Sequence, residues 1–208
     1  MKILCYGDSN TWGYIPNING YSKDTAMQKY DEKDCWWYPL MQGNEVFVNG
    51  LCGRCVAHEN KWLKNRNASL TMLDDLKEYR HLDIIIFQLG TNDCKSEYKD
   101  SAKEIAQNLE NLLKLVQSQT NAQILIISPA TIKEDNKITQ KYYIGAQAKS
   151  IELDYLYQNM TQKNNFYFIS GKDLETGEDG EHLTKNGHKQ LGCKVLTLVN
   201  SLNYTIVM

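Results

Sequence analysis

The sequence predicts an α/β fold, a three-layer sandwich in which a parallel sheet carries helices on both of its faces. Two observations predict it. Five short apolar runs recur along the 208 residues, and segments whose apolar residues have helical spacing lie between them. The runs are continuous in Ile, Val and Leu, which is typical of strands covered on both faces. No linker or internal repeat divides the chain, so we expect one domain over residues 1–208.

The apolar runs give the expected strands, which are residues 2–6, 45–49, 83–89, 123–128 and 166–169. Gly50, Gly90 and Pro129 directly follow three of them, as breakers at strand ends do. Because crossovers between parallel strands are right-handed, five such strands favour a doubly wound sheet. We expect the strand order 2-1-3-4-5.

Three long segments have the apolar spacing of helices, residues 100–118, 141–160 and 184–201. In the second, the spacing places Ile144, Ala148, Ile151, Leu153 and Leu156 on the face expected to be buried. Thr184 is the expected N-cap of the third. Shorter helices are expected near 35–42 and 67–80. The connections 13–35 and 129–141 are long and polar, as functional loops often are.

Composition excludes several classes of protein. The net charge is −2 and no basic stripe is present, so nothing favours a nucleic-acid partner. No apolar run reaches the roughly 18 residues of a membrane span. The N-terminal residues lack the pattern of a signal peptide, so we expect a cytoplasmic protein. In that compartment the six cysteines are reduced thiols.

Polar residues capable of chemistry follow several of the expected strands. In a doubly wound sheet, ligands bind beyond the carboxyl ends of the strands. The segments found there are Gly7-Asp8-Ser9, Gly50-Leu51-Cys52-Gly53-Arg54, Gly90-Thr91-Asn92-Asp93 and, past a loop, Asp179-Gly180-Glu181-His182. We therefore expect these four segments to surround one site.

Together the segments supply the groups that acyl transfer requires. Ser9 is a candidate nucleophile, His182 the base that takes its proton, and Asp179 the carboxylate that orients the imidazole. The Ser9 and Gly53 N–H groups and the Asn92 amide are candidate donors to an oxyanion. The alternative is that Ser9 is only a turn or cap residue. In that case the domain would bind a small anion without turning it over.

The four segments resemble the conserved blocks of a known family. GDSNTWG, the glycine of NGLCGR, GTND and DGEH resemble, in this order, the four blocks of SGNH (GDSL-type) hydrolases, and are most similar to the arylesterase/acyltransferase branch. The resemblance implies a flavodoxin-like fold, a Ser9–His182–Asp179 triad and an oxyanion hole of Ser9, Gly53 and Asn92. It also implies catalysis without a metal or cofactor. Asn10, where Leu is commoner, and Cys52 depart from the family pattern.

The resemblance implies a serine esterase that hydrolyses esters of short acyl chains, acetyl esters in particular, with acyltransferase activity where an alcohol replaces water. A thioesterase or a carbohydrate O-deacetylase would use the same triad. The expected partner is a small-molecule ester, and exposed loop aromatics are compatible with a homo-oligomer.

Other residues have expected roles near this site. Trp12, Tyr14, Trp36 and Trp37 are the aromatic candidates for a substrate-binding wall. Trp12 is the preferred one, whereas Trp36 and Trp37 are expected in the core. Asp8 and Asp93 are expected to fix the turns in which they lie.

The remaining histidines and the second loop have simpler expected roles. His58 and His81 are expected at the surface, and His188 is expected to face solvent or to cap the packing at the start of the last helix. Arg54 is expected to pair with a surface carboxylate. Cys52 and Cys55 form a C-x-x-C whose redox use is the weaker alternative, because the context of a redox motif is missing.

Overall fold

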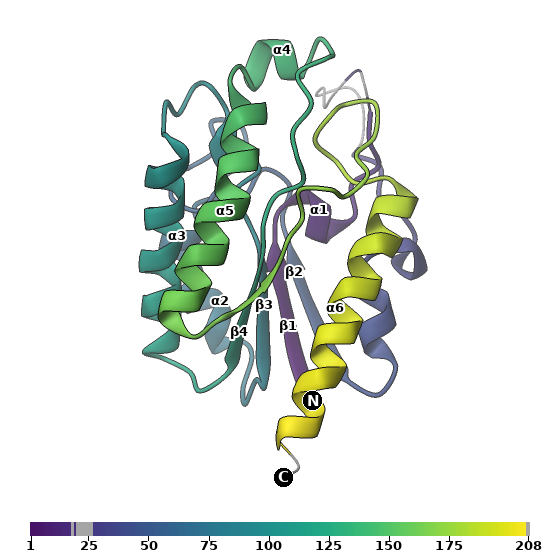
Figure 1. Ribbon diagram of the computed structural model, residues 1–208, viewed down its shortest axis with the longest axis vertical. Coiled ribbons are helices and arrows are strands. Elements are labelled where there is room, and N and C mark those ends of the chain that lie inside the picture. The colour runs from purple at the N-terminus through teal and green to yellow at the C-terminus, as the bar shows by residue number, and fades with distance from the viewer. Residues whose placement is uncertain (18, 20–26, 207–208) are drawn as a thin grey trace.

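The computed structural model describes residues 1–17, 19 and 27–206. Within them one five-stranded parallel sheet has the order β2-β1-β3-β4-β5 (Figure 1), which confirms the predicted fold class and strand order. The strands are β1 (Lys2–Gly7), β2 (Glu45–Gly50), β3 (Ile84–Gln88), β4 (Gln123–Ile127) and β5 (Tyr167–Ile169). The eight residues 18 and 20–26 of the expected loop 13–35 lie outside the described residues.

Helices connect the strands. The α-helices are α1 (Ser9–Trp12), α2 (Ala68–Lys77), α3 (Ala102–Gln117), α4 (Thr139–Tyr142), α5 (Ala146–Asn164) and α6 (Lys185–Ile206). Short 3₁₀ turns are η1 (Glu32–Asp34), η2 (Tyr38–Met41) and η3 (Asn92–Cys94). The helix expected near 35–42 is therefore one 3₁₀ turn. Thr184 is the N-cap of α6, as predicted, because its Oγ1 accepts a hydrogen bond from Gly187 N at 3.0 Å.

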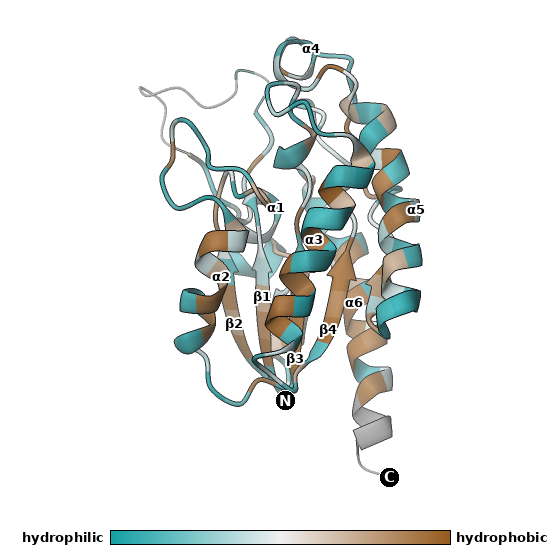
Figure 2. Ribbon diagram, turned by 90° about the vertical axis from the view of Figure 1, so that its left-hand side faces the viewer, coloured by the Kyte–Doolittle hydropathy of each residue, from teal (hydrophilic) through white to brown (hydrophobic). Residues whose placement is uncertain are grey.

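The sheet separates two hydrophobic cores. One core lies between the sheet and α2, α3 and α5, and the other between the sheet and α6 with η2 (Figures 1 and 2). Successive residues of β1 alternate between them. Leu4 and Tyr6 contribute to the first core, whereas Ile3 and Cys5 contribute to the second. This double burial explains why the strands are continuous apolar runs.

The helix expected over 141–160 differs from the prediction. It is split into α4 and α5, and only part of the apolar face that the spacing indicated is buried, because Leu153 lies in the core whereas Ile144 and Ile151 do not. Ile144 is 62% exposed and Ile151 is 50% exposed. The buried face of α5 also contains the polar residues Ser150 and Asp154, which bind to loops at the ends of the neighbouring strands.

Strand register brings the carboxyl ends of three strands together. Gly7 at the end of β1 is paired with Gly50 of β2 on one side and with Gln88 of β3 on the other. The segments that follow these strands therefore start from one edge of the sheet, as the sequence predicted.

Candidate active site

Ser9 is the first residue of α1, a four-residue helix that begins directly after β1. Asp8 is the N-cap, and its Oδ1 accepts a hydrogen bond from Asn10 N at 2.9 Å. The helix ends at Gly13, whose φ of +94° is easily adopted only by glycine. Thr11 Oγ1 donates to Gln88 Oε1 at 2.8 Å and ties α1 to β3. Ser9 is therefore held on a short, fixed turn and is 4% exposed.

His182 lies between Ser9 and Asp179. Its Nε2 is 2.8 Å from Ser9 Oγ, and its Nδ1 is 2.8 Å from Asp179 Oδ2. A carboxylate can only accept, so Nδ1 carries the proton and Nε2 is free to accept from the serine hydroxyl. The structure thus brings together three residues that the sequence separates by up to 173 positions.

Backbone groups hold the Asp179 carboxylate in place. The N–H groups of His182 and Glu181 donate to its Oδ1 at 3.1 and 3.3 Å, and Asn17 N donates to its Oδ2 at 2.9 Å. Burial alone would raise the pKa of Asp179. The hydrogen bonds and the neighbouring imidazole outweigh burial, so the pKa of Asp179 lies below its usual value.

The pKa of His182 is shifted in the opposite direction. Burial alone would lower it, but the charge of Glu181, the hydrogen bond to Asp179 and the charges of Asp179 and Asp8 together raise it above its usual value. The imidazolium is therefore favoured beside these carboxylates.

Gly53 and Asn92 line a cavity of about 130 Å³ together with Ser9 and His182. Asn92 begins η3, and its Nδ2 donates to the Arg54 carbonyl at 3.2 Å, which fixes the amide plane. Gly53 has a φ of +79°, and a Cβ there would lie 2.8 Å from the Asn60 side chain. The second and third loops thus face the serine, as expected.

Asp8 and Asp93 are buried and fix their loops, as predicted. Both oxygens of Asp93 accept from Val56 N, at 2.9 and 3.0 Å, so this carboxylate joins the loop after β3 to the loop after β2. Burial raises the pKa of each carboxyl to about 6, although hydrogen bonds oppose the shift.

Arg54 differs from its prediction in being buried, although it does pair with a carboxylate, since its Nη2 is 3.8 Å from Oδ2 of the partly exposed Asp75. Its Nη1 donates to Gly7 O at 2.9 Å and to Asn49 O at 2.5 Å, and the guanidinium stacks on the Tyr6 ring, 3.9 Å from its centroid. Arg54 therefore joins the ends of β1 and β2 beneath the site. A single sequence does not reveal this, because the isolated dipeptide Gly-Arg is typical of any polar loop.

His188 also differs from its prediction. It is fully buried, and its Nδ1 accepts from Trp36 N at 3.3 Å. Burial lowers its pKa to about 4, so it is a neutral residue of the core. His58 is half-buried, with Nε2 2.7 Å from Asp100 Oδ2. His81 is exposed, as expected.

The aromatic residues beside the triad include Tyr14, Trp62 and Tyr143. All three line the 130 Å³ cavity and the larger cleft next to it, and the Tyr14 ring centroid lies 4.3 Å from that of His182. Trp12, the expected substrate-binding residue, is not part of either lining; it packs near Tyr14 and Lys29. Trp36 and Trp37 are in the core, as predicted.

The cysteines of the second loop differ in their surroundings. Cys52 lines the small cavity with Ser9, whereas Cys55 is buried beneath the loop. Burial raises the pKa of Cys52 to about 12, so its thiolate is scarce at neutral pH. Both thiols are free.

Asn10, the residue that departs from the family pattern, connects the first and last segments of the site. Its Oδ1 accepts from Leu183 N at 2.8 Å, and its Nδ2 donates to Glu181 O at 3.3 Å. These two hydrogen bonds flank His182 and fix its loop relative to Ser9. The sequence shows the substitution but not this contact.

None of the helices among the described residues combines the length and apolar character that spanning a bilayer requires. In the same part of the chain, no three His, Cys, Asp or Glu side chains are grouped so that they could hold a metal ion.

Known structures resemble this fold over nearly its whole length. The native M. smegmatis aryl esterase superposes with a TM-score of 0.88 at 24% identity, covering 97% of this chain and 99% of its own. Est24, a carbohydrate acetylesterase from Sinorhizobium meliloti, superposes with a TM-score of 0.86 at 25% identity, covering 97% of this chain and 99% of Est24. Another carbohydrate acetylesterase family member from Sinorhizobium meliloti superposes with a TM-score of 0.85 at 27% identity, covering 96% of this chain and 97% of its own. No curated protein sequence matches.

The family model of the GDSL-like lipase/acylhydrolase family matches residues 5–190. This range includes Ser9, Gly53, Asn92, Asp179 and His182. The chain belongs to the GDSL-like lipase/acylhydrolase family and is an ester hydrolase.

Proposed function

We propose that the protein is a serine esterase that hydrolyses carboxylic esters of short acyl chains, with acetyl esters preferred. Ser9 is the nucleophile, His182 the general base and Asp179 the carboxylate that orients His182. The observation that carries this proposal is the continuous hydrogen-bonded chain from Ser9 Oγ through the His182 ring to Asp179. Family membership decides against the alternative of a domain that only binds an anion.

In the first half of the reaction, Ser9 Oγ attacks the ester carbonyl carbon and His182 Nε2 takes the hydroxyl proton. The negative charge that develops on the carbonyl oxygen is stabilised by Ser9 N–H, Gly53 N–H and the Asn92 amide. His182 then gives its proton to the alkoxide as the ester C–O bond breaks. Asp179 stays ionised throughout, which its lowered pKa favours.

In the second half, water attacks the acyl-enzyme carbonyl while His182 takes a proton from it, and His182 gives this proton to Ser9 Oγ as the bond to the acyl group breaks and the carboxylic acid leaves. An alcohol that occupies the water position would yield an ester instead, so acyltransferase activity uses the same steps. The adjoining cleft, with Tyr14 and Trp62 on its walls, supports alcohol binding.

Two cavities of different size support the preference for short acyl chains. The oxyanion-hole residues lie in the smaller one, of about 130 Å³, which suits a small acyl group. The larger one, of about 640 Å³, opens beside His182 and suits the alcohol part. Its aromatic rings and amide side chains favour a carbohydrate O-deacetylase as the second candidate.

The test is hydrolysis of p-nitrophenyl acetate by the wild type and by Ser9→Ala. We expect turnover by the wild type, loss of turnover in Ser9→Ala, and no change in Ser118→Ala, a control on the distant end of α3. A serine-directed phosphonate is expected to add to the intact mass of the wild type but not of Ser9→Ala. Unchanged activity in Ser9→Ala would refute the assignment.

Matched acetate and thioacetate esters would separate an esterase from a thioesterase. Cytoplasmic location and homo-oligomerisation stay predictions, which cell fractionation and sedimentation test.

A further inference from the structure

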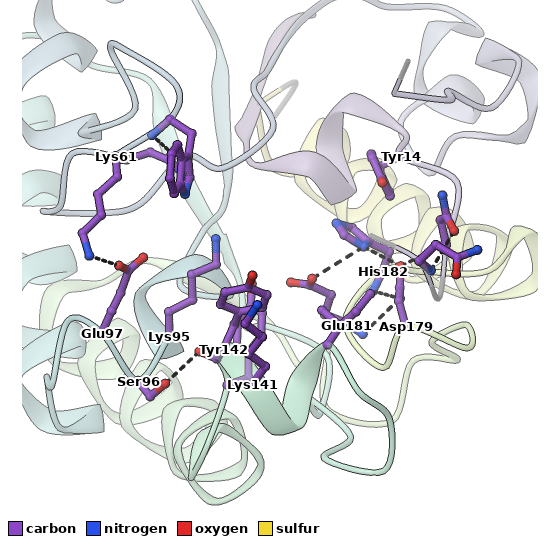
Figure 3. Close-up of a pocket in the computed structure, with 16 residues that line it drawn as sticks. Tyr14, Lys61, Lys95, Ser96, Glu97, Lys141, Tyr142, Asp179, Glu181 and His182 are labelled. Atoms are coloured by element: carbon purple, nitrogen blue, oxygen red, sulfur yellow. Dashed lines mark hydrogen bonds and ion pairs between the residues drawn. The ribbon is translucent and has the colours of Figure 1, made fainter. Parts of the chain in front are cut away.

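Two oppositely charged side chains lie apart from each other where the small cavity adjoins the larger cleft. Glu181 and Lys95 line both cavities, next to His182. Figure 3 shows the Lys95 ammonium and the Glu181 carboxylate directed from different sides toward the same open space. In the mechanism proposed above, this is where the alcohol part of an ester lies after the carbonyl has reached Ser9.

Both the backbone and the side chain of Glu181 make contacts that hold the residue at this position. Its backbone carbonyl accepts from Asn10 Nδ2 at 3.3 Å, and its N–H donates to Asp179 Oδ1 at 3.3 Å. The side chain is only 12% exposed, and Oε1 is 4.0 Å from His182 Nδ1. Glu181 lies beside the buried Tyr143 in the lining of the small cavity. Burial is the main cause of the raised pKa of the Tyr143 hydroxyl, and the negative charge of Glu181 is the second. The carboxylate is therefore preorganised and largely desolvated.

Lys95 extends from the loop after β3 over the other side of Tyr143. Its Nζ is 5.6 Å from the centroid of the Tyr143 ring. Among the described residues no carboxylate forms an ion pair with it. Lys61, at the outer edge of the same cleft, contrasts with it, because Lys61 is neutralised by Glu97 at 2.5 Å.

Lys141 also lines the cleft, but its Nζ lies over the Tyr142 ring, 4.8 Å from the centroid. Beside the catalytic His182, the cleft therefore presents Lys95 and Glu181 as a separated cation and anion.

A separated Lys and Glu at a half-buried position favour a ligand that brings the complementary charges. An uncharged alcohol would displace water from both groups without neutralising either one. An anionic alcohol would meet Lys95 but be repelled by Glu181, and a cationic alcohol would have the reverse pairing. Only an alcohol that carries both signs satisfies the two walls together.

We propose that Glu181 and Lys95 are specificity-determining residues that select esters of zwitterionic alcohols, with the cationic group beside Glu181 and the anionic group beside Lys95. This assignment rests on the proposed function, since it requires the alcohol part to lie in the larger cleft.

The test compares three acetate esters that differ in the charge of the alcohol. O-Acetylcarnitine is zwitterionic, acetylcholine is cationic, and 3,3-dimethylbutyl acetate is the neutral analogue of acetylcholine. Acid release is followed in a pH-stat for the wild type, Glu181→Gln and Lys95→Met. The control is Glu152→Gln, which removes one exposed carboxylate of α5 away from the cleft.

The readout is kcat/KM for each charged ester divided by kcat/KM for the neutral ester. This ratio cancels any change that Glu181→Gln causes in the basicity of His182. We expect Glu181→Gln to lower both ratios about tenfold, as loss of one charge contact at this depth would. Lys95→Met is expected to lower the acetylcarnitine ratio but to raise the acetylcholine ratio, and Glu152→Gln to change neither.

Ratios that change less than twofold in both cleft variants would overturn the assignment, even where the neutral ester is hydrolysed and the proposed function stands. If the wild type hydrolyses none of these three esters, its activity on p-nitrophenyl acetate decides the proposed function separately. Binding of the same esters to Ser9→Ala, measured by ligand-observed NMR, then decides this assignment. Equal affinity for all three would refute it, and tightest binding of acetylcarnitine, lost with Glu181→Gln, would support it.

Discussion

Replacing Gly50 with Ala should impair catalysis without touching any group of the proposed triad. Gly50 ends β2, where its backbone lies against α1. A Cβ added there would lie 2.7 Å from both the Thr11 carbonyl carbon and Trp12 Cα, and still closer to the Trp12 nitrogen. These neighbours are backbone atoms, so no side-chain rotation relieves the contact.

The size of the effect follows from the displacement. Non-bonded carbon atoms have favourable van der Waals contact at separations of about 3.5 Å or more. To reach that separation, α1 or the end of β2 must move by about 1 Å. Ser9 begins α1, and its Oγ is 2.8 Å from His182 Nε2. A misplacement of this size costs on the order of 10²-fold in rate. We therefore expect kcat/KM of Gly50→Ala for p-nitrophenyl acetate to fall about 100-fold.

Gly43→Ala is the matched control. Gly43 precedes β2 at the other end of the strand, has a φ of +91°, and has no atom within 4 Å of an added Cβ. Alanine there strains the backbone and lowers the thermal midpoint, but it leaves α1 in place. Activity of Gly50→Ala within threefold of wild type, with the fold intact by circular dichroism, would refute the reasoning.

Three further predictions concern the site and its support. Asn92→Ala should lower kcat for p-nitrophenyl acetate by about 10²–10³, since it removes one oxyanion donor; a loss below tenfold would exclude Asn92 from that role. The raised pKa of His182 predicts that kcat/KM rises with pH through a window above the ordinary value of ~6.5, as the imidazole becomes neutral. Glu181→Gln removes one raising charge and should shift this limb to lower pH; a limb that does not move would contradict the electrostatic account. Arg54→Met should lower the free energy of unfolding by about 3 kcal/mol, because buried carbonyl oxygens lose their donor; urea denaturation measures it, and a change below 1 kcal/mol would count against it.

The strands and their order were predictable because the three central strands, β1, β3 and β4, are buried on both faces. Residues such as Ile3 and Leu4 face opposite cores, so apolarity alone marks the strand. The site followed from the same fact, since the segments after the strands share one edge of a doubly wound sheet.

The orientation of α5 was not predictable from apolar spacing. Its buried face is anchored by polar groups, because Asp154 Oδ1 accepts from Ser128 Oγ at 2.5 Å and from Ser170 Oγ at 2.6 Å. Ser150 Oγ likewise accepts from Ile132 N at 3.0 Å. A pattern that scores only hydrophobicity assigns such residues to solvent. The burial of His188 was not predictable for the same reason, because a polar residue held by a hydrogen bond in the core has no hydrophobic signal.

The lining of the cleft was only partly predictable. Trp12 was a reasonable candidate by its proximity to Ser9 along the chain, yet the turn at Gly13 carries the chain onward so that Tyr14 stacks beside His182. Trp62 comes from a loop with no periodic pattern, and the sequence held no signal for it.

The contacts of Asn10 mean that the nucleophile and the base share one local opening equilibrium. A movement of the last loop that withdraws His182 from Ser9 also separates Leu183 N from Asn10 Oδ1 and lets this amide exchange its hydrogen with solvent. The exchange rate of this single amide therefore sets an upper limit on the fraction of molecules in which the loop has opened. On heating, activity would be lost with this opening, at a lower free energy than the unfolding of the sheet.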